Sequence, residues 1–463
     1  MAPTTDVDGD GVVAASSVPG AQPPSPTGST GRPDAAAQPD TTAQPDTTAQ
    51  PDAIAEPEST AVPLLVPSDP VVAPVTGLGD LLAWARQLAA GPAEPVAIDA
   101  ERASGFRYGG RAYLVQLRRR DTGTALLDPI ALGDLQVLDQ PLARSEWVLH
   151  AATQDLPCLA EAGIRPRRLF DTELAGRLAG FPRVGLAPLV ERMLGLQLRK
   201  GHGAADWSTR PLPHDWLVYA ALDVEVLVEL RDAMEAELTR QGKLEWAQQE
   251  FAALVAAPAP TPRPDPWRRT SGVHKITDRR ALAIVRELWL ARDSLARRRD
   301  VAPHRVLPDS AIIAAAAARP TTITTLVALP VFSGRMQRRN ADAWLTAVTR
   351  ALALPAEELP PSRFLGDGPP APAKWASRDA VAAARLQSAK AGLVELSERV
   401  HTPVENLMSP DLVRRVLWTP PDSDGAGLDA ALSQVLADRG ARPWQIELTE
   451  PVLRKAIVDA SRA

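Results

Sequence analysis

The sequence predicts an α/β sheet domain that is preceded by a disordered tail and followed by two all-α helical modules. Three observations lead to this prediction. Segments with strand character gather between residues 96 and 149, and helical segments follow them. From Lys275 onward every periodic segment has helical spacing. Residues 1–68 consist mostly of Pro, Ala, Thr, Asp, Gly and Gln, in a chain whose 463 residues suffice for two or three domains.

The tail carries a short polar repeat, Ala-Gln-Pro-Asp, which begins at Ala37, Ala43 and Ala49. A repeat this polar has no apolar face to bury, so we expect residues 1–68 to be disordered. We expect them to serve as a solubilising extension, with an interaction tail as the alternative. We expect their deletion to leave activity and thermal stability almost unchanged.

The cysteine content and the short length of the apolar segments indicate the cellular compartment of the protein. Cys158 is the only cysteine, which excludes an intramolecular disulfide and suits a reducing cytoplasm. No run approaches the roughly 18 apolar residues of a membrane span, and the N-terminus lacks the basic and apolar regions of a signal peptide. We therefore expect a cytoplasmic protein without membrane contact; the sequence does not predict its oligomeric state.

The α/β domain is expected over residues 69–255. It should begin with a helix over 79–90, and Asp171 is expected to cap a later helix. The expected strands cover residues 96–101, 113–117, 125–127 and 147–149. The further expected helices begin near 153–155 and cover 172–178, 186–194 and 216–230.

The helical half contains an internal similarity. Residues 256–272 and 355–372 are rich in Pro and small residues and are expected to be linkers, which leaves modules over 273–354 and 373–463. Both modules start with a long amphipathic helix, and Pro and Leu then recur about one hundred positions apart. Chance similarity between two helical segments is the alternative. The first module is basic: residues 275–352 hold 14 Lys and Arg against 6 Asp and Glu, a net charge of +8 that suits a polyanionic partner.

Two carboxylates, Asp99 and Glu101, end the strand that begins at Val96. Side chains alternate along a strand, so these two project from one face. Like charges held this close repel unless a cation lies between them, and a divalent metal is the usual solution. Two solvated acids at a strand end are the alternative.

Three further polar residues complete a candidate site. Asp155 lies where a strand leads into a helix, and it is either a site residue or a helix cap. Tyr219 and Asp223 are four residues apart, hence on one face of a helix whose other residues are mostly apolar. His150 and Cys158 are expected to be a buried, hydrogen-bonded histidine and a small core residue.

In their order and spacing these residues resemble the DEDD superfamily of 3′→5′ exonucleases, in the subclass with a tyrosine four residues before the last aspartate. Asp99 and Glu101 match the first motif, Asp155 the second, and Tyr219 with Asp223 the third. Lys200, the Asp206-Trp207…Arg210-Pro211-Leu212 loop and Phe170-Asp171-Thr172 narrow the resemblance to ribonuclease D and its exosome-associated relatives. The basic module resembles the HRDC domain that follows the nuclease in that family.

The resemblance implies a ribonuclease H-like fold, with a mixed sheet flanked by helices, followed by HRDC-like modules. It implies two divalent ions, Mg²⁺ or Mn²⁺, held by Asp99, Glu101, Asp155 and Asp223, because two-metal sites supply the nucleophile and neutralise phosphoryl charge. Tyr219 would orient the attacking water. The expected activity is 3′→5′ hydrolysis of RNA to nucleoside 5′-monophosphates, with a free 3′ end of tRNA precursors and other small structured RNAs as substrate.

Several residues are candidates for RNA contact. Trp207 is expected to stack on a base or to pack in its loop, and Arg210 to hold a phosphate. The resemblance to ribonuclease D adds Lys200 to these candidates for RNA contact. The basic side chains of the first helical module track a phosphate backbone or face solvent without a partner; they are Arg297, Arg298, Arg299, Arg338 and Arg339.

Two rival functions remain at this point. One is a DNA exonuclease of the Werner or proofreading type, since the same site cleaves either sugar. The other is a non-catalytic RNA-binding adaptor on the same fold. Because every expected metal ligand precedes Val255, we expect truncation after that residue to preserve cleavage of short unstructured RNA and to weaken binding of tRNA-like substrates.

Overall fold

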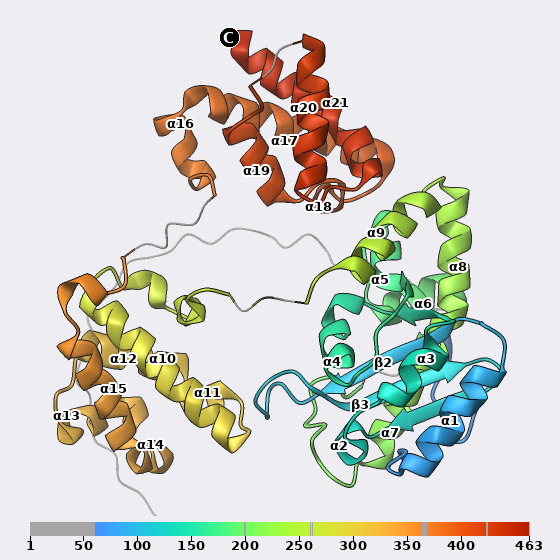
Figure 1. Cartoon of the computed structure of the whole chain (residues 1–463), viewed down its shortest axis with the longest axis horizontal. Helices are drawn as coiled ribbons and strands as arrows, with labels where there is room; N and C mark the ends of the chain where they lie inside the picture. The colour runs from blue at the N-terminus through green and yellow to red at the C-terminus, as the bar shows by residue number, and fades with distance from the viewer. Residues whose placement is uncertain are drawn as a thin grey trace, which may run out of the picture. The chain divides into compact units, whose positions relative to one another are not determined.

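The computed structural model describes residues 61–198, 201–259, 261, 263–362, 368–422 and 425–462. The polar repeat of the predicted tail lies outside these residues. Within them the predicted fold class is confirmed: an α/β domain with a mixed sheet precedes two helical modules (Figure 1). No helix of the described part of the chain is long and apolar enough to cross a membrane.

The central sheet has five strands in the order β4-β3-β2-β5-β6. β3 runs antiparallel to β2 and β4, whereas β5 runs parallel to β2 and β6, so the sheet is mixed. The four expected strands are present, and β6 is a fifth that the sequence analysis did not predict. The strands are β2 (Val96–Arg102), β3 (Ala112–Arg119), β4 (Gly123–Leu127), β5 (Glu146–Leu149) and β6 (Arg168–Asp171).

Helices cover both faces of this sheet. One face of β2, with Ile98, packs against the first helix, α1, which contributes Leu81. The opposite face, with Ala97, packs against Val224 and Leu227 of α7 and α8. The helices of this domain are α1 (Leu78–Ala90), α2 (Pro129–Leu132), α3 (Asp139–Leu142), α4 (Leu156–Glu161), α5 (Thr172–Leu178), α6 (Leu186–Leu194), α7 (His214–Glu225), α8 (Leu227–Arg240) and α9 (Leu244–Ala256), with short 3₁₀ turns η1 (Gln136–Leu138) and η2 (Ala152–Gln154).

The helix expected over 216–230 is two helices. α7 ends at Glu225 and α8 begins at Leu227, with Val226 between them at a ψ of −8°. No Pro or Gly marks this junction, so the apolar periodicity alone could not reveal it.

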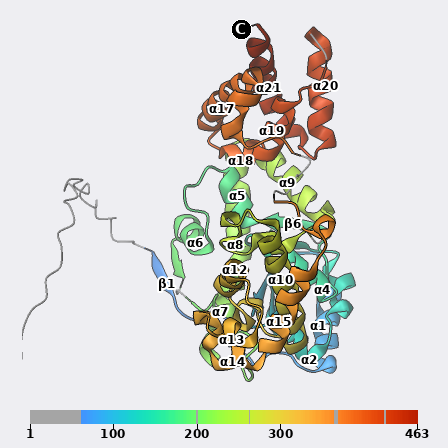
Figure 2. The ribbon, with the colours of Figure 1, turned by 90° about the vertical axis from the view of Figure 1, so that its left-hand side faces the viewer.

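The residues just before position 69 are structured, in contrast to the predicted tail boundary. β1 (Val62–Leu64) pairs in parallel with β7 (Leu196–Leu198), and Figure 2 shows it beside α6. The Ser68 hydroxyl donates a hydrogen bond of 2.5 Å to Glu225 at the end of α7. We therefore expect deletion of residues 1–68, unlike deletion of residues 1–58, to lower stability.

The middle module has its own hydrophobic cluster. It begins earlier than expected, because Trp267, within the predicted linker, is 2% exposed and packs in this cluster. The module comprises η3 (Pro266–Arg269), η4 (Val273–Lys275), α10 (Arg279–Arg299), α11 (Pro303–Val306), α12 (Asp309–Ala318), α13 (Ile323–Val327), η5 (Pro330–Ser333), α14 (Arg335–Arg339), α15 (Ala341–Ala353) and η6 (Ala356–Glu358).

The C-terminal module repeats the pattern of the middle one. α10 and α17 both span 21 residues and both end at a left-handed residue, Asp300 and His401, with φ of 48°. A four-residue helix and a longer helix follow each. The C-terminal elements are η7 (Pro372–Lys374), α16 (Trp375–Arg378), α17 (Ala380–Val400), α18 (Val404–Leu407), α19 (Pro410–Trp418), α20 (Gly425–Asp438) and α21 (Pro443–Arg462).

The C-terminal module shares a hydrophobic cluster with the α/β domain. Phe170, Leu230 and Phe251 of the domain lie in one cluster with Leu396 and Trp444 of the module. The middle module instead contacts the domain through the loop between β2 and β3, where the Tyr108 hydroxyl donates to Asp293. The two modules are thus attached to the α/β domain by different kinds of contact.

Candidate active site

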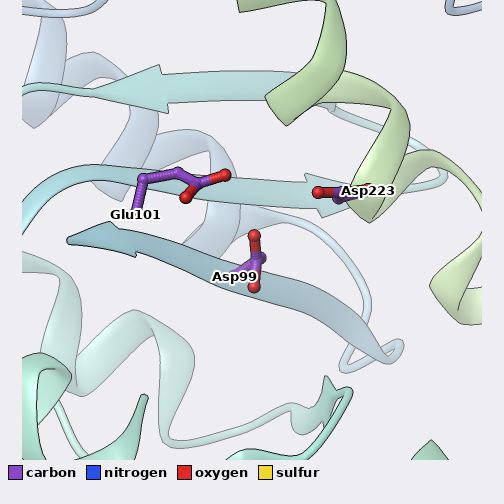
Figure 3. A group of neighbouring side chains, drawn as sticks. All are labelled: Asp99, Glu101 and Asp223. Atoms are coloured by element: carbon purple, nitrogen blue, oxygen red, sulfur yellow. The ribbon is translucent and has the colours of Figure 1, made fainter. Parts of the chain in front are cut away.

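β2 presents Asp99 and Glu101 on one face of the sheet. Their neighbours Ile98 and Ala100 point into the cluster on the opposite face, as the alternation of a strand requires. Figure 3 shows the side chains of Glu101 and of Asp223 on α7 extending toward each other, with Asp99 between them. The predicted pairing of these acids on one face agrees with this arrangement.

Asp99, Glu101 and Asp223 form a group that could hold a metal ion. One carboxylate oxygen from each lies within 4.8 Å of the others. They line a cavity of about 330 Å³, together with Asp155 and Tyr219. Carboxylate oxygens are hard ligands that suit Mg²⁺ or Mn²⁺, so the residues present fit a divalent cation.

Asp155 lies in the same cavity and does not cap a helix. It precedes α4, but its side chain accepts no capping hydrogen bond, which removes that alternative reading. The Arg102 guanidinium lies 3.4 Å from the Asp155 carboxylate and donates to the Gln154 carbonyl at 2.9 Å. Arg102 belongs to none of the motifs recognised in the sequence.

A shift in strand register accompanies the position of Arg102. Glu101 pairs with Leu114 of β3, whereas Arg102 pairs with Ala112, so Tyr113 is skipped. The extra residue therefore belongs to β3, the strand that pairs with Arg102. Arg102, the last residue of β2, lines the carboxylate cavity.

The crowding of these carboxylates raises their pKa values. Burial, and then the charges of Asp99, Asp223 and Asp155, raise the pKa of Glu101 to about 10. Burial and the charge of Asp99 raise the pKa of Asp155 to about 8, against the opposing effect of Arg102. Burial also raises the pKa of Asp99 and Asp223. A cluster that holds protons this firmly favours positive charge, which a divalent ion supplies.

Tyr219 lies one turn before Asp223 on α7 and lines the cavity. Burial and the charges of Asp223 and Glu101 raise its pKa, so the hydroxyl stays protonated and acts as a hydrogen-bond donor. Gly201 lies against the tyrosine ring, and a Cβ at this position would collide with it. The glycine is therefore required by the close approach of backbone and ring.

Gln116 is a second residue that the sequence analysis missed. It is fully buried on β3 directly opposite Asp99, and its amide donates to the Asp99 carboxylate at 3.2 Å. This bond fixes the orientation of the carboxylate. The available signal was a single Gln among the apolar residues of that strand.

Asp171 holds the turn that carries the second motif. It caps α5, as predicted, by accepting from the Glu173 and Leu174 amides. It also accepts hydrogen bonds from the amides of Ala151 and Ala152. Ala151 has a left-handed φ of 57°, a conformation that needs such support.

His150 and Cys158 match their expected structural roles. The His150 ring bonds to the Thr172 hydroxyl at 2.9 Å, and burial lowers its pKa to about 4, so it is neutral. Cys158 is 3% exposed within the cluster beneath the sheet. His150 lines the carboxylate cavity as a neutral ring, and Cys158 is not among the residues that line it.

The loop before α7 is a structural element, which revises two expectations. Trp207 is fully buried against Trp216, so it packs in its loop and cannot stack on a base. All five N–H groups of Arg210 are engaged: two bind Asp128, and the others bind the carbonyls of Trp207, Thr209 and Tyr113. Arg210 therefore anchors this loop and has no N–H left for a phosphate.

Of the remaining RNA-contact candidates, those that the structure describes lie in the middle module. Lys200 lies outside the described residues. In the middle module Arg297 donates to the Tyr108 hydroxyl, Arg298 to Ser294 and Arg299 to Asn340. Arg338 and Arg339 are exposed on α14.

Family models match the α/β domain and both helical modules. Residues 72–239 match a model described as a 3′-5′ exonuclease, residues 281–348 an HRDC domain, and residues 368–457 a 3′ to 5′ exonuclease C-terminal domain. Ribonuclease D of Gluconacetobacter diazotrophicus is 35% identical over 315 residues, which cover 66% of this chain and 78% of that protein.

Solved structures agree with these matches. A protein from Bifidobacterium adolescentis has a TM-score of 0.77 at 37% identity, covering 86% of this chain and all of that one. Escherichia coli RNase D, described as an exoribonuclease involved in structured RNA processing, has a TM-score of 0.63 at 25% identity, covering 83% of this chain and 98% of that one.

Proposed function

The chain belongs to the ribonuclease D family, and we propose that its catalytic site consists of Asp99, Glu101, Asp155, Tyr219 and Asp223. We also propose that it trims 3′ extensions of small structured RNAs, including tRNA precursors. Family membership makes it a 3′→5′ exoribonuclease that acts on RNA and uses divalent metal ions. The residues that carry the reaction, the number of ions and the natural RNA are parts of the proposal.

The observation that carries the proposal is the group of carboxylate oxygens from Asp99, Glu101 and Asp223 within 4.8 Å of one another. We propose that these residues and Asp155 hold two divalent ions, Mg²⁺ or Mn²⁺. Bound metal ions lower the barrier of phosphodiester hydrolysis by activating water and neutralising phosphoryl charge. Gln116 keeps the Asp99 carboxylate in place through its hydrogen bond of 3.2 Å.

Two side chains act beside the carboxylates. Tyr219, held protonated by its raised pKa, donates a hydrogen bond that orients the attacking water. Arg102, next to Asp155 and in the same cavity, offers positive charge to the phosphate that enters. The HRDC domain and the C-terminal module would hold the structured body of the RNA while its single-stranded end reaches the cavity.

A cleavage assay tests this function. We expect the protein to shorten 5′-labelled RNA oligomers stepwise in Mg²⁺ or Mn²⁺, to release nucleoside 5′-monophosphates, and to stop in a chelator. A matched DNA oligomer should be cleaved far more slowly. A tRNA with a 3′ extension should be shortened to its mature end; if an unstructured RNA of equal length is the only substrate cut, the tRNA assignment fails.

Replacing Tyr219 with phenylalanine should slow turnover by roughly tenfold to a hundredfold, since it removes one hydrogen bond in the transition state and keeps the packing of the ring. The metal concentration that gives half-maximal activity should change little, because the carboxylates remain. Single-turnover rates across a metal titration measure both quantities. Wild-type rates in this variant would make the tyrosine a packing residue.

The raised pKa values predict a pH dependence of stability. The folded, metal-free protein holds protons on Glu101 up to a pKa of about 10 and on Asp155 up to a pKa of about 8, whereas the unfolded chain releases them near about pH 4. Stability of the metal-free protein should therefore fall as the pH rises from about 5 to about 8. Saturating Mg²⁺ replaces these protons and should flatten the dependence. Thermal midpoints measured across this pH range in chelator and in Mg²⁺ test this. The same pH dependence of the midpoint in both conditions would contradict it.

A further inference from the structure

A second, basic cavity lies at the end of α6 away from the carboxylates. Its volume is about 540 Å³, and we define it by Phe181, Arg192, Arg240, Lys243, Trp246 and Arg399. The first five belong to the α/β domain and Arg399 to the end of α17. None of these residues lines the carboxylate cavity.

The charge of this basic cavity is strongly positive. Four cationic side chains line it, with Glu237 as the acidic lining residue. Arg240 and Gln241 bind Glu237, and these hydrogen bonds lower its pKa to about 2, so its charge is already compensated. No carboxylate among the described residues forms an ion pair with Arg192 or Arg399, and both side chains are exposed. Their charge is available to an anion.

The walls of the basic cavity are held in place. Lys243 is 5% exposed, and its ammonium donates to the carbonyls of Leu178 at 2.7 Å and His401 at 3.1 Å. Gly180 has a left-handed φ of 79°, and a Cβ there would collide with the His401 carbonyl. Arg192 lies over the Phe181 ring, 4.4 Å from its centre. An anion that enters therefore meets cations already in position, which reduces the entropic cost of binding.

The position of the basic cavity relates it to the reaction. Leu186 and Ala187 at the start of α6 line the carboxylate cavity, and Arg192 near its end lines the basic one. Ala187 and Arg192 are separated by about 7–8 Å along the helix axis, at 1.5 Å per residue. An RNA whose 3′ nucleotide occupies the carboxylate cavity has further phosphates within this range.

We propose that the basic cavity binds a backbone phosphate of the RNA substrate, a few nucleotides upstream of the bond that is cleaved. This inference rests on the proposed function, because it takes the carboxylate cavity as the site of the 3′ end. Arg192 and Arg399 supply the contacts, and the buried Lys243 contributes positive charge from the wall. The site increases the binding affinity for RNAs that are long enough to reach from one cavity to the other.

The test uses the full-length chain with Asp99→Asn, so that RNA is bound without being cut. Arg192→Glu with Arg399→Glu should weaken binding of a labelled dodecamer by roughly tenfold or more, and should make the dependence of log affinity on log salt shallower by about one per lost contact. Binding of a nucleoside 5′-monophosphate, which has no upstream phosphate, should not change. Arg378→Glu with Arg439→Glu, both exposed and outside the cavity, is the charge-matched control and should have a small effect on the binding of either ligand.

Several outcomes would overturn the proposal. They are an equal loss of affinity in the control variant, an equal loss of affinity for the nucleoside 5′-monophosphate, and an unchanged affinity for the dodecamer. Displacement of the dodecamer by inorganic phosphate alone at equal potency would mean a free-anion site instead. If the glutamate variant melts early, Arg192→Gln with Arg399→Gln replaces it. Cleavage of a trinucleotide by the unmodified chain reports separately on the proposed function, so the two failures are distinguishable.

Discussion

Asp223→Asn should lower the rate of 3′-end cleavage by roughly a thousandfold or more, because catalysis depends on several kcal/mol of charge stabilisation by bound metal. Asp99→Asn should act alike, since both residues belong to the group whose oxygens lie within 4.8 Å of one another. Asp215→Asn is the matched control: it lies on the same helix, in the first turn, and its side chain is exposed. It should keep near-native rates.

The same variants separate a catalytic role from a structural one. In the metal-free protein Asp99 and Asp223 repel Glu101 and raise its pKa, so neutralising either should leave the thermal midpoint in chelator unchanged or higher. The rise in midpoint on adding Mg²⁺ should be lost, because a ligand is missing. A midpoint that falls in parallel with activity would instead make these aspartates structural residues.

The part of the site that sequence alone predicts is the part set by local periodicity. The two-residue repeat of β2 places Asp99 and Glu101 on one face, and the four-residue spacing places Tyr219 above Asp223. Asp155 belongs to the same cavity, although only the order of the motifs suggested that it joins them.

The residues that were missed depend on contacts between distant segments. Gln116 is significant because the register of β3 sets it opposite Asp99, and Arg102 because it lies 3.4 Å from Asp155, which is distant in the chain. Arg210 looked like a phosphate ligand in sequence, yet Asp128, distant in the chain, takes two of its N–H groups. Pairing and burial of this kind follow from tertiary structure, which a single sequence does not display.

The domain boundaries show the same limit. Composition marked the polar tail and the linkers, but Val62–Leu64 and Trp267 are short apolar elements within such segments, and both find partners in the fold. The sequence also did not predict the hydrophobic core that the α/β domain shares with the C-terminal module. Each of the two contributes amphipathic helices, and the sequence pattern of such helices does not show which partner their apolar faces pack against.

This shared core reverses the expected effect of truncation after Val255. Removing residues 256–463 would take away the C-terminal part of a hydrophobic cluster shared with the α/β domain and would uncover Trp246, which stacks on Trp444. It would also remove Arg442 and Trp444, which both bind the buried Glu250. An unpaired buried carboxylate and an exposed apolar face both destabilise a fold. We now expect the truncated domain to lose cleavage of short RNA because it fails to fold stably, which its thermal midpoint and circular dichroism would reveal.

Two tryptophan substitutions test this coupling in the full-length chain. Trp444 stacks on Trp246 of the α/β domain at 4.9 Å, and Trp344 is fully buried in the separate cluster of the middle module. Each change to alanine should cost its own core about 3–5 kcal/mol. Trp444→Ala should therefore lower the temperature at which cleavage of a short RNA is lost, whereas Trp344→Ala should leave that temperature near the native value while unfolding the middle module. Equal inactivation temperatures in the two variants would mean that the C-terminal module is as separable from the nuclease as the middle one.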